Sequence, residues 1–182
     1  MIQDKKTIGE VRICVDLRKL NDACLHDPFP TPFTDEVLES IEGKEMYSFT
    51  DSFSGYHQVK IVKEDRHKTT FVIEWGCYQY TIMPFGLKNT PAIFSRIVVF
   101  ALKDFIHKFL EVYFDDWTMF GLVRDHIESL CMMLGQCLHY HITLNSKKCI
   151  FSELFGVLLG HVVFRNGILV NPIKVTIILE LP

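Results

Sequence analysis

The order of hydrophobic and polar residues divides the chain into short runs typical of strands and longer periodic runs typical of helices. Alternating or β-branched runs suit strands, because successive side chains point to opposite faces of a sheet. The dipeptides Trp75-Gly76 and Asn166-Gly167 stand between β-rich runs and predict hairpin turns. On these criteria strands are predicted at residues 10–17, 46–51, 69–74, 77–83, 108–114 and 117–121.

Apolar residues three or four positions apart predict several helices. The first, at residues 34–43, begins with a threonine and two acidic residues and ends at a glycine. The second begins at Thr90-Pro91, because proline fits the first helical turn. A third includes residues 127–138, and Asn171-Pro172 indicates the start of one more. Because hairpins alternate with helices, we predict an α+β fold in which helices pack on one face of an antiparallel sheet.

Composition indicates an ordinary globular protein. The chain has 182 residues, of which 48% are hydrophobic and 23% charged, enough for one domain with a core. The longest apolar run, residues 155–164, is about half of the roughly 20 residues that a membrane span needs, and no hydrophobic signal segment opens the chain. We therefore expect a soluble intracellular protein that is not secreted and has no membrane partner. The six cysteines form no C-x-x-C pair and are interpreted as buried thiols.

Charge alone does not indicate a nucleic-acid-binding protein. The formal net charge is -3, whereas proteins that bind phosphate backbones usually carry a basic excess. Basic residues do gather in the first twenty positions, but the alternative is an ordinary solvated surface. The basic residues of this segment are Lys5, Lys6, Arg12, Arg18 and Lys19.

Two adjacent carboxylates, Asp115 and Asp116, stand between two β-rich runs. Neighbouring carboxylates at a strand turn repel each other and are costly to bury, so a cation should compensate them. Hard divalent cations such as Mg²⁺ prefer carboxylate and phosphate oxygens. Aspartate is also common in turns, so for this pair alone a simple turn is the alternative. Asp51 ends another β run, and two strand ends could then bring three acidic side chains together.

Six motifs carry a resemblance to a known family. They are RICVDLRKLN at 12–21, FTDSFSGYHQ at 49–58, MPFGLKNTPAIF at 83–94, YFDD at 113–116, LNSKKCIF at 144–151 and LGHVV at 159–163. In order and spacing they resemble the reverse transcriptases of gypsy-type LTR retrotransposons, especially those of plants. The resemblance covers nearly the whole chain, from Val11 to Pro172.

The resemblance implies a right-hand polymerase fold and RNA-directed DNA polymerase activity. Residues 1–182 would form a reverse transcriptase domain fragment, with fingers at about 1–45 and 60–90 and palm at about 46–59 and 91–171. Thumb, connection and ribonuclease H regions are expected to be absent from it. Because the thumb normally grips the duplex, we expect weak primer-template affinity.

Catalytic and metal-binding roles are implied for Asp51, Asp115 and Asp116. They would hold two Mg²⁺ ions, with Mn²⁺ as an alternative, which sharpen the primer 3′-hydroxyl and hold the triphosphate. The implied partners are an RNA or DNA template with its primer, dNTPs, and the protease, ribonuclease H and integrase domains of a polyprotein. The expected location is the cytoplasm or a retrotransposon particle.

The same resemblance implies roles for further residues. Arg12 would bind the triphosphate, with Lys5 or Lys6 as a second basic contact. Two alternatives stay open, because Tyr56 could be an ordinary half-buried tyrosine and His161 a hydrogen-bonded core histidine. The implied nucleotide-binding residues are Arg12, Ser52, Tyr56, Phe85, Gly86 and Phe114, and the implied primer or template residues are Tyr113, Leu159, Gly160 and His161.

Three rival functions stay open at this point. The chain could be a catalytically inactive retroelement remnant with residual nucleic-acid binding. It could be a metal-dependent nuclease, since such enzymes also cluster carboxylates. A nonenzymatic interaction domain could use an exposed phenylalanine-rich surface. The intact carboxylates, together with Arg12 and Tyr56, favour retained polymerase chemistry.

Overall fold

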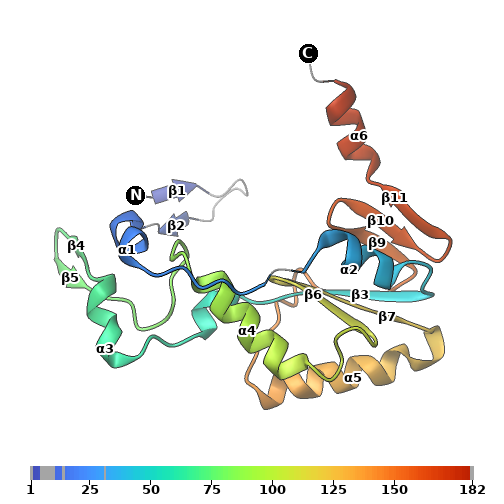
Figure 1. The fold of residues 1–182 in the computed structure, drawn as a ribbon, viewed down its shortest axis with the longest axis horizontal. Helices are drawn as coiled ribbons and strands as arrows, with labels where there is room; N and C mark the ends of the chain where they lie inside the picture. Colours follow the sequence, from blue (N-terminus) through green and yellow to red (C-terminus); the bar gives the residue numbers. More distant parts are fainter. Residues whose placement is uncertain (1, 5–10, 14, 31, 181–182) are drawn as a thin grey trace. The chain divides into compact units, whose positions relative to one another are not determined.

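The structure is a computed structural model that describes residues 2–4, 11–13, 15–30 and 32–180. The chain divides into two compact units, each assembled from two separate stretches of sequence. The first unit comprises Met1–Phe29 and Ser54–Arg96, and the second comprises Pro30–Phe53 and Ile97–Pro182. Figure 1 labels most of the elements of both units.

Short elements joined by turns make up the first unit. Its two antiparallel strand pairs are β1 with β2 and β4 with β5. The hairpin predicted around Trp75 is confirmed, with Glu74 and Trp75 as its two turn residues. The elements of this unit are β1 (Ile2–Asp4), β2 (Val11–Ile13), α1 (Arg18–Ala23), a 3₁₀ turn (Gly55–Gln58), α3 (Lys63–Arg66), a second 3₁₀ turn (His67–Thr69), β4 (Phe71–Ile73), β5 (Gly76–Tyr78) and the start of α4 (Thr90–Leu102).

The strand predicted at residues 10–17 is wrong in its second half, because residues 15–17 form no strand and lead into a helix. β2 ends at Ile13, and α1 begins at Arg18. The carboxylate of Asp16 accepts hydrogen bonds from the backbone N–H of Arg18 at 3.1 Å and from its guanidinium at 2.6 Å. These bonds lower the pKa of Asp16 to about 2. An anion that accepts a backbone N–H at a helix N-terminus stabilises that end, so local polar contacts override the alternating pattern.

Two antiparallel sheets form the centre of the second unit. The four-stranded sheet has the order β6-β7-β3-β8, and the three-stranded sheet has the order β11-β10-β9. The hairpin predicted at Asn166-Gly167 is confirmed as the β10–β11 connection. The elements of this unit are α2 (Thr34–Ile41), β3 (Met46–Asp51), the end of α4, β6 (Leu110–Tyr113), β7 (Asp116–Gly121), α5 (Val123–His139), β8 (Ile150–Glu153), β9 (Phe155–Leu158), β10 (His161–Phe164), β11 (Gly167–Val170) and α6 (Pro172–Leu179).

Both faces of the four-stranded sheet are covered, as Figure 1 shows for α5 and α2. Tyr47 of β3 is fully buried in a core with Phe120 of β7 and the apolar side of α2. Ser48, the next residue of β3, points the other way, and its hydroxyl lies 2.7 Å from Nε2 of His126 in α5. The predicted α+β class with antiparallel sheets is confirmed, and α2 adds a helix on the face opposite α5.

Within the described residues, no helix combines the length and the apolar character needed to cross a membrane.

The described cysteines are free thiols. Cys137 is buried, which raises its pKa to about 11, but Cys77 and Cys131 are exposed. The interpretation as buried thiols was therefore wrong for Cys77 and Cys131, of which Cys77 lies on the open β4–β5 hairpin.

Candidate active site

Asp115 and Asp116 lie where β6 turns into β7. Tyr113 and Asp116 are cross-strand partners, so Phe114 and Asp115 are the two residues of the turn. Phe114 has a φ of 53°, a left-handed conformation that costs a residue with a side chain roughly 1–2 kcal/mol. Its carbonyl accepts a hydrogen bond from Nε1 of the fully buried Trp117 at 3.1 Å. The buried indole thus anchors a strained turn, and such strain is common at functional sites.

Asp51 ends β3 directly opposite Asp116 of β7. Residues paired in this way have Cβ atoms about 4.5–5.5 Å apart, so their side chains interact. Like charges in this position are destabilising. The two strand ends therefore meet as the sequence pattern indicated, and they place two carboxylates side by side.

A lysine partly neutralises this pair. Nζ of Lys148 lies 2.8 Å from Oδ2 of Asp51. The Asp51 side chain is 19% exposed and that of Lys148 is 60% exposed. The lysine follows a turn that is itself fixed to Asp51, because the backbone N–H of Asn145 donates to the Asp51 carbonyl at 2.8 Å.

Lys148 contacts Asp51, so the negative charge of Asp116 is less well neutralised. Partial burial of its carboxyl and then the negative charge of Asp51 raise the pKa of Asp116, while Lys148 lowers it. A carboxyl whose pKa is raised in this way favours an additional cation nearby. A cation bound there would offset the negative charge of Asp51 and Asp116.

Asp115 is held by the residue that follows Asp51. Its backbone carbonyl accepts the N–H of Ser52 at 3.3 Å, and its Oδ1 accepts the Ser52 hydroxyl at 3.4 Å. Ser52 is 5% exposed, so its hydroxyl is directed into this contact. The position of Ser52 explains how the turn is fixed to the end of β3, while its predicted contact with a nucleotide stays a prediction.

A cavity of about 590 Å³ opens beside the carboxylates. Asp51, Asp116 and Lys148 form its polar part, and β3, β7 and β9 supply apolar walls. A polar end beside an apolar wall is typical of sites that bind small molecules or nucleotides. Its other lining residues are Phe49, Thr50, Trp117, Thr118, Ile150, Glu153, Phe155, Gly156, Val157, Leu158 and Leu159.

The donor set fits a hard divalent cation in its chemistry. Asp51 and Asp116 offer carboxylate oxygens to one cavity, and the raised pKa of Asp116 reflects negative charge that a cation would offset. In the part of the chain that the structure describes, however, no three His, Cys, Asp or Glu side chains are gathered closely enough to hold a metal ion. The Oδ1 atom of Asp115, the third member of the predicted set, accepts the Ser52 hydroxyl.

The first unit contains the remaining predicted nucleotide residues. Phe85 packs on Tyr56 with ring centroids 5.2 Å apart, and Phe94 lies 5.8 Å from Tyr56 in an edge-to-face contact. Gly86 has a φ of 96°, a conformation that glycine adopts without strain. Tyr56 is therefore half-buried in an aromatic cluster, and its contact with a sugar stays a prediction.

The basic residues predicted to bind the triphosphate are only partly described. Arg12 lies in β2, paired with Gln3 of β1. Lys5 and Lys6 lie outside the described residues. Their roles therefore stay predictions.

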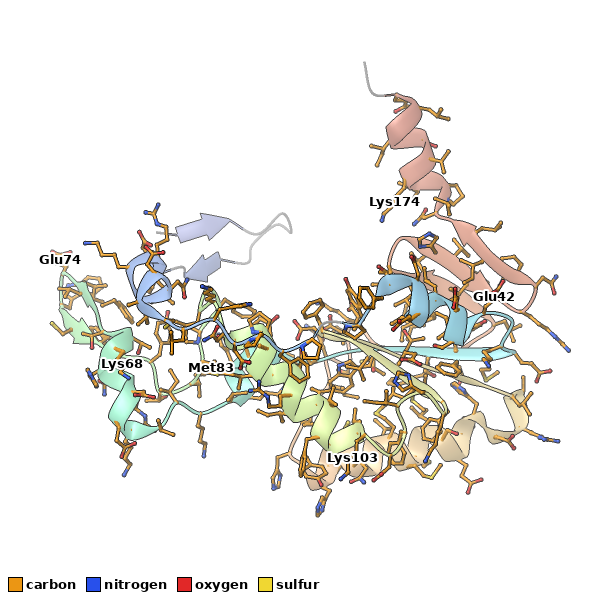
Figure 2. The ribbon with its side chains drawn as sticks, viewed as in Figure 1. Glu42, Lys68, Glu74, Met83, Lys103 and Lys174 are labelled. Atoms are coloured by element: carbon orange, nitrogen blue, oxygen red, sulfur yellow. The ribbon has the colours of Figure 1, made fainter. Side chains whose placement is uncertain are left out.

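Leu159 and Gly160 form the turn between β9 and β10, and His161 is the first residue of β10. Both turn residues have positive φ, 49° and 82°, as in a type I′ hairpin turn. A Cβ atom on Gly160 would collide with the side chain of Lys174 on α6, which Figure 2 labels. Nδ1 of His161 lies 3.3 Å from the carbonyl oxygen of Leu159. This contact fits the hydrogen-bonded alternative for His161, and primer binding stays a prediction.

The sequence pattern missed two residues that organise these sites. One is Lys148, whose signal was its place in the motif that continues into β8. The other is Asn21, whose side-chain amide donates to the Gly86 carbonyl at 2.7 Å and accepts the N–H of Lys88 at 2.8 Å. Asn21 ends the first motif, so both residues stood within segments already singled out.

Comparison with known proteins agrees with this geometry. The family model described as "Reverse transcriptase (RNA-dependent DNA polymerase)" matches residues 3–163. The chain is 33% identical over 180 residues, 98% of its length, to the retrovirus-related Pol polyprotein from transposon 297 of Drosophila melanogaster. It is 31% identical over 172 residues, 94% of its length, to the corresponding polyprotein from transposon gypsy of the same organism. The chain spans 17% of the length of each of these relatives.

A solved structure of the foamy viral protease-reverse transcriptase in complex with double-stranded DNA shares the fold, with a TM-score of 0.88. The match is 23% identical in sequence and covers 100% of this chain and 32% of that one. The predicted polymerase fold and the resemblance to gypsy-type elements are confirmed. The chain belongs to the reverse transcriptase (RNA-dependent DNA polymerase) family.

Proposed function

We propose that this chain carries out RNA-directed DNA synthesis, transferring a nucleotide from a dNTP to a primer 3′-hydroxyl. The observation that carries the proposal is the cross-strand pairing of Asp51 with Asp116, beside Asp115 in the adjoining turn. Two paired carboxylates, one of them with a raised pKa, favour a bound cation, and the proposed nucleotidyl transfer uses divalent ions.

Asp51, Asp115 and Asp116 would hold the divalent ions, Mg²⁺ or Mn²⁺. When bound, such ions neutralise the triphosphate and lower the pKa of the attacking hydroxyl. The role of the protein is then to position: the β6–β7 turn and the end of β3 present the carboxylates from rigid strands. Rigid strands are suited to this, because small displacements of a catalytic group cost large factors in rate.

Substrate contacts are proposed for the residues that the family motifs single out. The ring of Tyr56 would pack against the nucleotide sugar, Phe85 would belong to the loop of the nucleotide pocket, and Arg12 would bind the phosphates. The other nucleotide-binding residues would be Ser52, Gly86 and Phe114, and the primer or template residues Tyr113, Leu159, Gly160 and His161. Fingers at about 1–45 and 60–90 and palm at about 46–59 and 91–171 remain our assignment, although residues 30–45 belong to the second compact unit.

The partners follow from the same reaction. A primer paired to an RNA or DNA template would bind the site, and the foamy viral protein of similar fold was solved in complex with double-stranded DNA. Protease, ribonuclease H and integrase domains are proposed neighbours, because the curated relatives are Pol polyproteins several times longer than this chain.

The test is incorporation of labelled deoxynucleotide on a poly(rA)-oligo(dT) primer-template with Mg²⁺ or Mn²⁺ at low salt. The wild-type chain is compared with its Asp115→Asn, Asp116→Asn variant and with Asp104→Asn. Asp104 is an exposed acid on the same unit, so it controls for the loss of negative charge. Incorporation that survives in Asp104→Asn and vanishes in the double variant supports the proposal.

Two other results would contradict it. No incorporation by the wild-type chain at high protein concentration and low salt favours an inactive retroelement remnant with residual nucleic-acid binding. Degradation of the primer-template in place of extension, lost in the same double variant, favours a metal-dependent nuclease.

A further inference from the structure

The carboxylate of Asp51, a proposed metal ligand, already has a cationic partner. Nζ of Lys148 lies 2.8 Å from Oδ2 of Asp51. An ionised carboxylate only accepts hydrogen bonds, and an ammonium group only donates them, so the contact is a charge-assisted hydrogen bond. A metal ion and the ammonium group would therefore compete for the negative charge of this carboxylate.

The backbone specifies this contact, so it is more than a chance approach of a long side chain. The Asn145 N–H donates to the Asp51 carbonyl at 2.8 Å, which fixes the start of the turn to the end of β3. The N–H groups of Lys148 and Cys149 both donate to the Asn145 carbonyl, at 2.9 Å and 3.0 Å. Asp51 thus holds, through its backbone, the turn that brings Lys148 to its own side chain.

The local charge explains why a counter-ion is needed there. Asp51 and Asp116 face each other across β3 and β7, and Asp115 immediately precedes Asp116 in the adjoining turn. Three acidic residues at two strand ends repel one another unless a cation stands among them. Lys148 lines the same cavity as Asp51 and Asp116, which is where that cation is needed.

We propose that Lys148 is a built-in counter-ion, which occupies Asp51 in the metal-free protein and must leave that carboxylate when a divalent cation binds. The proposal rests on the proposed function, since it concerns the metal site of that reaction. Lys148 is a positioning residue in this scheme: it keeps the carboxylates together before loading, and it weakens metal binding by competing for Asp51.

The size of the effect follows from the exposure of the pair. Partly exposed ion pairs contribute modestly, and loss of a nearby positive charge also favours a divalent ion. We expect Lys148→Met to tighten Mn²⁺ binding by about three- to tenfold. Lys148→Arg keeps a cation in place and should leave the affinity within about twofold of wild type.

The experiment measures Mn²⁺ binding to the full chain, with free ion counted by electron paramagnetic resonance and neither nucleotide nor nucleic acid present. Lys147→Met is the matched control, because Lys147 is the neighbouring exposed lysine and its removal changes the net charge equally. In the Asp51→Asn background, Lys148→Met should tighten binding no more than Lys147→Met does, because the carboxylate that Lys148 contacts has lost its charge. Tighter binding in Lys148→Met than in Lys147→Met, lost in that background, supports the proposal.

Different results would overturn the counter-ion proposal and the proposed function. If wild type binds Mn²⁺, and Asp51→Asn weakens it, but Lys148→Met and Lys147→Met behave alike, the counter-ion proposal is overturned and the metal site stands. If neither wild type nor Lys148→Met binds Mn²⁺ at millimolar concentration, the proposed function loses its metal site and the counter-ion proposal falls with it.

Discussion

Asp51 and Asp116 are direct cross-strand partners at the ends of β3 and β7. Selection for the stability of the sheet alone would not favour this pair, because like charges placed opposite each other destabilise antiparallel strands. Natural proteins retain such conflicts mainly where function needs them. The pair therefore indicates a site in which stability is given up for the binding of a cation.

Asp116→Asn should stabilise the metal-free protein while abolishing nucleotide incorporation. The substitution removes repulsion from Asp51, for which we expect a gain of about 0.2–1 kcal/mol in the free energy of unfolding. Because the folded state raises the pKa of Asp116, its charge opposes folding above that pKa and ceases to do so as the pH falls through it. The gain should therefore shrink in acid. Urea denaturation in EDTA across the pH range measures the gain in the free energy of unfolding at neutral pH and its loss in acid. A variant less stable than wild type at neutral pH would contradict the expected repulsion.

A pH dependence of the opposite sign is expected from His126. Its side chain is buried in α5 against Ser48, Nδ1 has no hydrogen-bond partner among the described residues, and burial lowers its pKa. The unfolded chain takes up a proton as the pH falls below about 6.5, whereas the folded state resists protonation. The contribution of neutral His126 is thus fully present above the unfolded pKa and is lost as the pH falls toward the folded pKa.

His126→Gln tests this expectation, because glutamine can still hydrogen-bond Ser48 but does not titrate. The free energy of unfolding of the variant should fall less than that of wild type between about pH 7.5 and about pH 5.5. His139→Gln, an exposed position on the same helix, should leave the pH profile unchanged. Equal profiles for wild type and His126→Gln would show that His126 does not carry the effect.

Much of this arrangement could be predicted from the sequence, because it depends on local patterns. The helical periodicity of α5 and the turn dipeptide Asn166-Gly167 act over a few neighbours, and both elements were placed correctly. The periodicity did not identify the buried face of α5, because Ile127 and Leu138 are exposed. The ends of β3 and β7 were also marked by their aspartates. Periodicity and turn chemistry therefore account for the framework that presents Asp51 and Asp116.

What could not be predicted depends on contacts between distant residues. Lys148 is 97 positions from Asp51, and no local pattern reveals that pairing. The same holds for Asn21, which reaches across 65 positions to Gly86. The strand expected at residues 10–17 failed for the opposite reason, since Asp16 makes a local side-chain bond that hydrophobic alternation ignores.

Asn21 should control the loop that contains Gly86. Asn21→Asp keeps the acceptor for the Lys88 N–H at 2.8 Å but loses the donor to the Gly86 carbonyl at 2.7 Å, and Asn21→Ala loses both. If this loop forms part of the nucleotide site, the KM for dNTP should rise in the order wild type, Asp, Ala, with a smaller change in kcat. Steady-state kinetics on the poly(rA)-oligo(dT) substrate provide the measurement. An unchanged KM in Asn21→Ala would remove the Gly86 loop from the proposed nucleotide site.

Gly156 of β9 should tolerate no side chain while Phe49 stays in place. A Cβ atom on Gly156 would overlap the Phe49 ring, and overpacking of this kind typically costs about 1–3 kcal/mol. Because Phe49 and Asp51 lie on the same side of β3 and line one cavity, displacement of the ring should also lower incorporation. Phe49→Leu provides space, so in the double variant Gly156→Ala should cost much less than it does alone.

The control for Gly156→Ala is a glycine at which alanine has room. Gly135 lies in α5 with open space around it, so Gly135→Ala should stabilise the chain by about 0.5–1 kcal/mol through helix propensity. Opposite signs at the two glycines, measured by urea denaturation, would separate overpacking from the general effect of replacing glycine. A Gly156→Ala cost that persists unchanged in the Phe49→Leu background would mean that the backbone of β9, and not the Phe49 ring, requires glycine there.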